Sequence, residues 1–331
     1  MTDSPTQGGI GASYDASILR SPRPQLGRPQ GSAAHSRPDK SRCHLADQAI
    51  SRKRPVSPVF PLAVSAGLVA GSHVATWGMY KDSPHEGFVV ARYLRSVVLA
   101  VAIALVLAGV SGIHLTDAND LVPFFGSVYA LERVATEFWK YVLREDEQSK
   151  YTIPMRMAVN GRVVERRAVR YSVGLALLVG MAATAGAIQQ LQLMHAGWPH
   201  WAVFLVVGSA GGWYSAFGGA WKDAPIEGFD LRKFPRSPIV SLAWALVVAR
   251  FTTDWLTIAV ASAGYSVATI ETYKKFRNPE IPPGKFANAP VLHPETLLLR
   301  RYFRPAFATL WLIMIATIGM ALVEPHRGLL V

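Results

Sequence analysis

The chain has 331 residues, of which 50% are hydrophobic, and it carries a formal net charge of +12. Its apolar residues gather into runs of roughly twenty, the length that crosses the hydrocarbon core of a bilayer, so we expect an all-α polytopic membrane protein. The basic residues lie between these runs, where they meet lipid headgroups, and we expect no nucleic-acid partner. The single cysteine, Cys43, and the lack of metal-type Cys/His spacing exclude an internal disulfide and structural zinc.

Residues 1–56 are rich in Gly, Ser, Pro, Gln and Arg and have little periodic apolar content. Such a segment cannot bury enough apolar surface to offset its ordering entropy, so we predict a disordered basic tail. A signal peptide does not fit, because the first long apolar run begins only near Pro58. The alternative is that the tail is not native and that the protein starts near Val56 or Val59.

An eleven-residue motif occurs twice, at 78–88 and 219–229, with a constant offset of 141 residues. Both copies read Lys-Asp-x-Pro-x-Glu-Gly-Phe from their fourth residue, and both follow an apolar run. An Arg-Ser pair follows each copy, at Arg95 and at Arg236. Agreement at so many positions indicates an internal duplication, with the motif as the short loop between two spans of each half.

The apolar runs predict about eight transmembrane helices, arranged as two parallel four-helix repeats over 57–197 and 198–331. Each half holds an even number of spans, so both enter the membrane in the same direction. The third run is ambiguous because Glu132, Arg133 and Glu137 would be costly against lipid, and an interfacial helix is the alternative. The predicted spans are 58–80, 89–113, 119–141 and 171–194, then 200–221, 238–252, 254–273 and 305–323.

The basic residues predict the orientation of the chain. Of the Lys and Arg in the loops, 22 follow the odd-numbered spans and one, Arg327, follows an even-numbered span. By the positive-inside rule the motif loops are cytoplasmic, and we expect the inner (plasma) membrane of a bacterium. The tail disagrees, because its 9 Lys and Arg would lie outside.

The motif is the first candidate site. Two carboxylates four residues apart, beside a lysine and an arginine, are able to hold Mg²⁺ against a phosphate, because hard cations prefer carboxylate oxygens and basic groups bind the remaining charge. The structural alternative is a capped turn between helices, with the proline in the first turn of the following helix. We predict catalytic metal ligands at Asp82, Glu86, Asp223 and Glu227, and phosphate-binding residues at Lys81, Arg95, Lys222 and Arg236.

A second pair of sequences, Glu137 to Lys140 and Glu271 to Lys274, ends the third and seventh spans. Three-residue spacing favours a plain ion pair on one helix face. The functional alternative is that Glu137 and Glu271 complete the substrate-binding sites of the motifs. The basic segments that follow, 142–170 and 274–304, are typical of lipid-facing loops, or of a lid over the site, and Asn160-Gly161 predicts a turn.

Several classes of function are disfavoured. The span histidines do not pair as haem ligands, and a lone one such as His73 is typical of an interhelical hydrogen bond. No glycine-rich phosphate loop or nucleophile elbow occurs. The mid-span residues are apolar, small or neutral, whereas ion-coupled carriers place ionisable groups there. We therefore predict a Mg²⁺-assisted membrane enzyme acting on a lipid or polyprenyl phosphate. A transporter or channel between the repeats, and a non-catalytic scaffold, stay open as alternatives.

Overall fold

The computed structural model describes most of the chain after the predicted tail, which lies outside the described residues together with Val331 and a few loop positions. The side chain of Glu227 is also outside the description. The described residues are 59–111, 115–148, 151, 153–195, 197–277, 286, 289–325 and 327–330.

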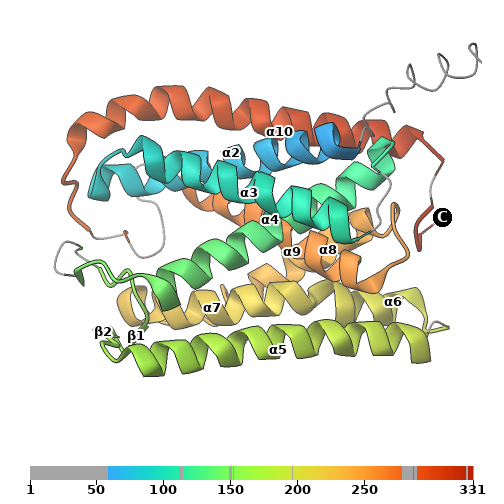
Figure 1. Ribbon diagram of the computed structural model, residues 1–331, viewed down its shortest axis with the longest axis horizontal. Coiled ribbons are helices and arrows are strands. Elements are labelled where there is room, and N and C mark those ends of the chain that lie inside the picture. Colours follow the sequence, from blue (N-terminus) through green and yellow to red (C-terminus); the bar gives the residue numbers. More distant parts are fainter. Residues whose placement is uncertain are drawn as a thin grey trace, which may run out of the picture. The chain divides into compact units, whose positions relative to one another are not determined.

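Five helices in the described chain are long and apolar enough to cross a membrane, which confirms an all-α membrane protein. Their axes are roughly parallel in Figure 1. The expected eight crossings in two repeats stay a prediction. Three of the five helices are α2 (Val59–Glu86), α3 (Val90–Val110) and α5 (Arg167–Met194). The fourth is the run His200–Ile226, which contains α6 (His200–Val203), the π-helix η3 (Phe204–Gly208) and most of α7 (Ser209–Glu227). The fifth is the run Pro294–Val323, which contains the 3₁₀-helix η5 (Pro294–Leu299) and α10 (Arg300–Val323).

Two further helices, α4 (Ala118–Phe138) and α9 (Trp255–Thr272), pack against each other in the middle of the bundle. Around α4 lie α2, α3 and α10, and around α9 lie α5, α7 and the shorter apolar helix α8 (Arg236–Val248). The final helix of each sequence half therefore packs on the central helix of the other half. The charged residues that made the third span ambiguous face this interior and not lipid, which explains how α4 tolerates them.

Local chemistry specifies where the central helices begin. The side chain of Asp117 accepts a hydrogen bond from the backbone nitrogen of Asp120 at 3.1 Å, and Asp254 accepts one from Thr257 at 2.7 Å. These are N-cap bonds that satisfy otherwise unpaired donors. The Glu324 carboxylate, just after α10, also accepts from the Asn119 backbone nitrogen at 3.3 Å, so the C-terminal region fastens the start of α4.

The motif is helical, which corrects the prediction of a short loop between two spans and also the alternative of a capped turn with the proline in the following helix. It forms the last turns of α2 and α7, and each helix ends at a glycine with positive φ, Gly87 (74°) or Gly228 (83°). Glycine takes this conformation without a steric penalty, which makes it a common helix terminator. Pro84 lies inside the last turn and cannot donate to the Tyr80 carbonyl, which instead accepts a 3.3 Å hydrogen bond from Arg300 Nε.

Two smaller predictions are confirmed. Strands β1 (Ala158–Val159) and β2 (Arg162–Val163) pair as an antiparallel hairpin, and Asn160 and Gly161 have the positive φ angles of its turn. The buried His73 makes an interhelical hydrogen bond, with its Nδ1 3.0 Å from the Tyr129 hydroxyl.

Candidate functional site

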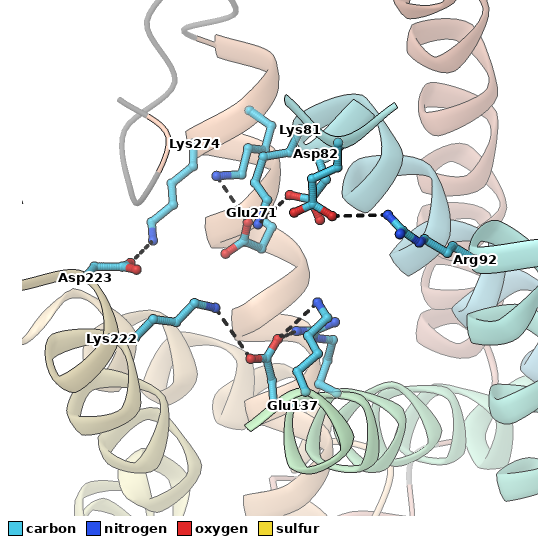
Figure 2. Close-up of polar contacts among 12 residues, drawn as sticks. Lys81, Asp82, Arg92, Glu137, Lys222, Asp223, Glu271 and Lys274 are labelled. Atoms are coloured by element: carbon cyan, nitrogen blue, oxygen red, sulfur yellow. Dashed lines mark hydrogen bonds and ion pairs between the residues drawn. The ribbon is translucent and has the colours of Figure 1, made fainter. Parts of the chain in front are cut away.

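Charged side chains from both motif copies and from the ends of α4 and α9 converge at one end of the bundle (Figure 2). We call this group the charge cluster. Among the side chains that the structure describes, those joined by ion pairs in this cluster are seven basic and five acidic, an excess of two positive charges. Its members are Lys81, Asp82, Glu86, Arg92, Arg133, Glu137, Lys140, Lys222, Asp223, Glu271, Lys274 and Lys275.

Glu137, near the end of α4, links the two sequence halves. Its carboxylate accepts a hydrogen bond from Lys222 Nζ of α7 at 3.4 Å, and it also pairs with Arg133 and, at 3.8 Å, with Lys140. The Glu137 side chain is 31% exposed, so these charges are only partly solvated. The prediction of a simple Glu137–Lys140 ion pair is confirmed but incomplete, because three cations share this carboxylate.

The other acids of the cluster also pair with basic groups. Asp82 lies 3.1 Å from Lys81, and Glu86 lies 3.3 Å from Arg92. In the second half the pairs are Asp223 with Lys274 at 4.0 Å and Glu271 with Lys275 at 3.7 Å. The expected Glu271–Lys274 pair is therefore not formed: Glu271 pairs with Lys275, and Lys274 pairs with Asp223.

Two π-helical segments position several of these groups. The segment η1 (Trp139–Leu143) follows α4 directly, and η4 (Tyr273–Arg277) follows α9. A π-helical turn holds more residues than an α-helical turn and changes the direction of the side chains after it. Glu137 and Glu271 have different partners, and the sequence contains one sign of this. Glu137 follows a Val-Ala-Thr triplet directly, whereas Glu271 follows the second Val-Ala-Thr one residue later, which rotates it by about 100° around the helix.

The two predicted phosphate-binding arginines lie apart from these pairs. In the described chain, Arg95 of α3 makes no side-chain hydrogen bond or ion pair, and its nearest charged neighbours include Arg92, Arg144 and Glu132. The Nε atom of Arg236, at the start of α8, is buried and has no hydrogen-bond partner among the described residues. The structure thus brings Lys81, Lys222, Asp82, Asp223, Glu86, Glu137 and Glu271 together and leaves both arginines outside the network of ion pairs.

An open hollow lies beside the second motif, between the end of α7 and the β1–β2 hairpin. We call it the hairpin hollow. Its cavity volume is about 30 Å³, and about 350 Å³ when the open solvent at its mouth is included, so it is a shallow recess. The indole nitrogen of Trp221 donates to the Ala158 carbonyl at 3.1 Å, and the Lys222 ammonium lies 5.6 Å from the centre of the Tyr141 ring. The lining residues are Tyr141, Pro154, Arg156, Ala158, Gly161, Trp221, Lys222, Pro225 and Ile226.

Within the described residues, no group of three or more His, Cys, Asp or Glu side chains is placed to hold a metal ion. Comparison with protein-family models, curated protein sequences and solved structures finds no match for this chain. Sequence reasoning named the motif and the two glutamates, but it did not select Arg133, Lys275 and Arg156 as site residues. The i, i+4 spacing of Arg133 to Glu137 and of Lys275 to Glu271 is a signal that could have found the first two. Only the fold places Arg156 beside the second motif.

Lys275 gives the site a pH-dependent stability. Its burial, together with the nearby Lys81 and Lys274, lowers the pKa of the ammonium from 10.5 to about 8, although Glu271 opposes this shift. Between pH 8 and 10.5 the unfolded chain binds more protons than the folded one, so the free energy of unfolding rises with pH. We expect a rise of about 3 kcal/mol at most. Melting curves of wild type and Lys275→Met in detergent test this. If the stabilities of both proteins change with pH in the same way, the low pKa does not belong to Lys275.

Proposed function

We propose that this protein binds the phosphorylated headgroup of a lipid or polyprenyl phosphate at the charge cluster. The observation that supports this best is the excess of two positive charges at the end of membrane-length helices. A phosphate monoester carries about two negative charges near neutral pH, and charge-assisted hydrogen bonds to it are among the strongest in proteins. The apolar chain of such a ligand would lie along the exposed faces of the spans.

We also propose where the protein lies and how its helices are arranged. The 22-to-1 distribution of loop Lys and Arg supports a bacterial inner membrane with the motif loops in the cytoplasm. Two parallel four-helix repeats are supported by the order of elements, since α2 and α7 both end in a motif copy, and α4 and α9 are both followed by π-helical segments.

We further propose that the ligand is a substrate and that Mg²⁺ assists the reaction at its phosphate. A bound phosphate would attract the lysines that now face Asp82 and Asp223, which would release these carboxylates for a metal. Glu86 or Glu227 would supply the second carboxylate of the metal site at whichever motif copy holds the phosphate. The metal would neutralise charge on the phosphate, and the lysines would hold its remaining oxygens.

One observation favours a transporter as the second candidate. Glu132 of α4 is fully buried, and its Oε2 has no hydrogen-bond partner in the described chain, while Oε1 accepts from Thr136 at 2.7 Å. An ionisable residue inside a membrane bundle is typical of ion pathways. Loss of proton-coupled or ion-coupled flux in reconstituted Glu132→Gln vesicles would support this alternative.

A thermal-shift experiment tests the proposed function. Wild-type protein in mild detergent is melted with dioleoyl phosphatidic acid or a polyprenyl phosphate, with Mg²⁺ or with EDTA. Binding to the folded state raises the free energy of unfolding by mass action, by about 2.7 kcal/mol when the ligand is at one hundred times its Kd. The melting temperature rises with it. We expect a shift with either phosphate, a larger shift with Mg²⁺, and loss of the Mg²⁺ increment in Asp82→Asn with Asp223→Asn.

The matched ligands are diacylglycerol and the polyprenol, which lack only the phosphate. If these neutral ligands shift the melting temperature as much as the phosphates do, the charge cluster does not bind phosphate. If no phosphate shifts it, the cluster is structural and the transporter and scaffold alternatives move ahead.

A further inference from the structure

The two motif copies differ in what covers them, and this difference assigns the ligand to one side. We infer that the phosphate binds in the hairpin hollow beside the second motif, at Lys222 and Arg156, and that the matching position beside the first motif is closed by the chain itself. The inference rests on the proposed function and specifies where and how many times the ligand binds.

The hairpin hollow has the chemistry of an anion site at a membrane surface. Lys222 and Arg156 supply two positive charges to its lining, and Trp221 and Tyr141 supply aromatic rings. The Arg156 side chain is buried, and its Nε has no hydrogen-bond partner among the described residues. A buried donor without an acceptor is costly, so the guanidinium would gain a hydrogen bond on turning its Nε toward a phosphate oxygen.

The position of Arg156 is held by its surroundings. Gln148 Oε1 accepts hydrogen bonds from the backbone nitrogens of Met155 and Arg156, both at 3.0 Å. Nearby, the fully buried Arg170 of α5 donates to Glu145 at 2.6 Å, which ties the segment after η1 to α5. The hairpin is therefore fastened in front of the second motif before any ligand arrives, which lowers the cost of binding.

A carboxylate now occupies part of the place that a phosphate would take. Glu165 accepts from Arg156 Nη2 at 3.0 Å, and its side chain is 72% exposed. Water screens the charge of so exposed a carboxylate, so a doubly charged phosphate is able to replace it. Glu145, 3.8 Å from Arg156 Nη1, already pairs with Arg170 and would stay in place.

The corresponding position of the first motif is covered. The backbone nitrogens of Leu292 and His293 both donate to the Pro84 carbonyl at 2.9 Å. His85 makes a 2.9 Å hydrogen bond to the Pro290 carbonyl, and its ring stacks on Phe286 with centroids 4.3 Å apart. The same Phe286 ring lies 5.7 Å from the Lys81 ammonium. Lys81 is thus shielded where Lys222 borders open space.

One sequence difference accounts for much of this asymmetry. The position of His85 in the first copy is Ile226 in the second. Isoleucine has no polar atom with which to fasten a covering loop, and Ile226 instead lines the open hollow. Beside it, Trp221 is 57% exposed and Phe217 of α7 is also exposed, which provides an apolar surface for the chain of an amphiphile.

Native mass spectrometry of the full chain in detergent tests the inference. The probe is dioleoyl phosphatidic acid, with diacylglycerol and inorganic phosphate as separate arms that distinguish a lipid headgroup from free phosphate. We expect one phosphatidic acid per chain, weaker binding of inorganic phosphate and no specific binding of diacylglycerol. Ile226→Trp, which fills the hollow, and Arg156→Gln should each weaken binding of phosphatidic acid at least tenfold.

The matched control is Ile239→Trp, the same substitution at an exposed position on α8, which should leave the affinity unchanged. Because Arg156→Gln also loses its partners Glu145 and Glu165, Ile226→Trp is the decisive variant if the first fails to fold. If wild type binds one phosphatidic acid but Ile226→Trp binds it equally well, or if two molecules bind with equal affinity, the inference is wrong while the proposed function survives. If wild type binds no phosphatidic acid, the proposed function itself fails.

Discussion

Gly264→Ala is expected to destabilise the protein by about 3 kcal/mol, because added atoms at a close-packed contact force the backbones apart. Gly264 lies where α9 crosses α4, and a Cβ atom there would overlap the carbonyl oxygen of Gly126 and lie 3.0 Å from the backbone nitrogen of Ala130. Backbone atoms cannot rotate away as side chains do. Small residues at such crossings are how membrane helices approach closely.

The direction of this effect separates packing from helix propensity. Alanine is a better helix former than glycine by about 1 kcal/mol, so propensity alone predicts stabilisation. Gly180→Ala in α5 and Gly319→Ala in α10 are the controls, since a Cβ at either position meets no atom within 4 Å. Melting temperatures in detergent should fall for Gly264→Ala and stay level or rise for both controls. Equal behaviour of all three variants would mean that α4 and α9 do not cross at Gly264.

Glu137→Gln is expected to cost about 2 kcal/mol, somewhat below the roughly 3–5 kcal/mol of breaking a fully buried ion pair, because Glu137 is partly exposed. The amide keeps the shape of the side chain but leaves Lys222, Arg133 and Lys140 without their shared negative charge. The three cations would then repel one another at low dielectric. Denaturant unfolding monitored by tryptophan fluorescence measures the loss.

A double-mutant cycle with Lys222→Met assigns part of this cost to the bond between the halves. Residues in one ion-pair network couple by about 0.5–3 kcal/mol, so the double variant should be more stable than the sum of the single losses predicts. The control is Glu165→Gln, which should change stability by less than about 0.5 kcal/mol because the Glu165 carboxylate is exposed and Arg156 keeps Glu145 as a partner. Additive losses in the cycle would show that Lys222 and Glu137 do not depend on each other.

The amino-acid sequence by itself determined the class of the protein and the outline of its helices. The apolar runs predicted α2, α3, α5 and α10 because crossing a bilayer requires a hydrophobic stretch of about twenty residues, and that length is a property of the chain alone. The repeated motif likewise identified Lys81, Asp82, Lys222 and Asp223, since the same charged residues recur beside two apolar runs of the sequence.

The tertiary structure alone decided which charges pair, which motif copy is open and where α4 and α9 lie. Both motif copies continue their helices up to a positive-φ glycine, and in the first copy Arg300, more than two hundred residues away, satisfies the carbonyl freed by Pro84. Glu137 pairs with Lys222 only because the fold brings the ends of α4 and α7 close together, through their shared neighbour α9. Coulomb energies depend on distances in space, and spacing along the chain specifies those distances only within one helix.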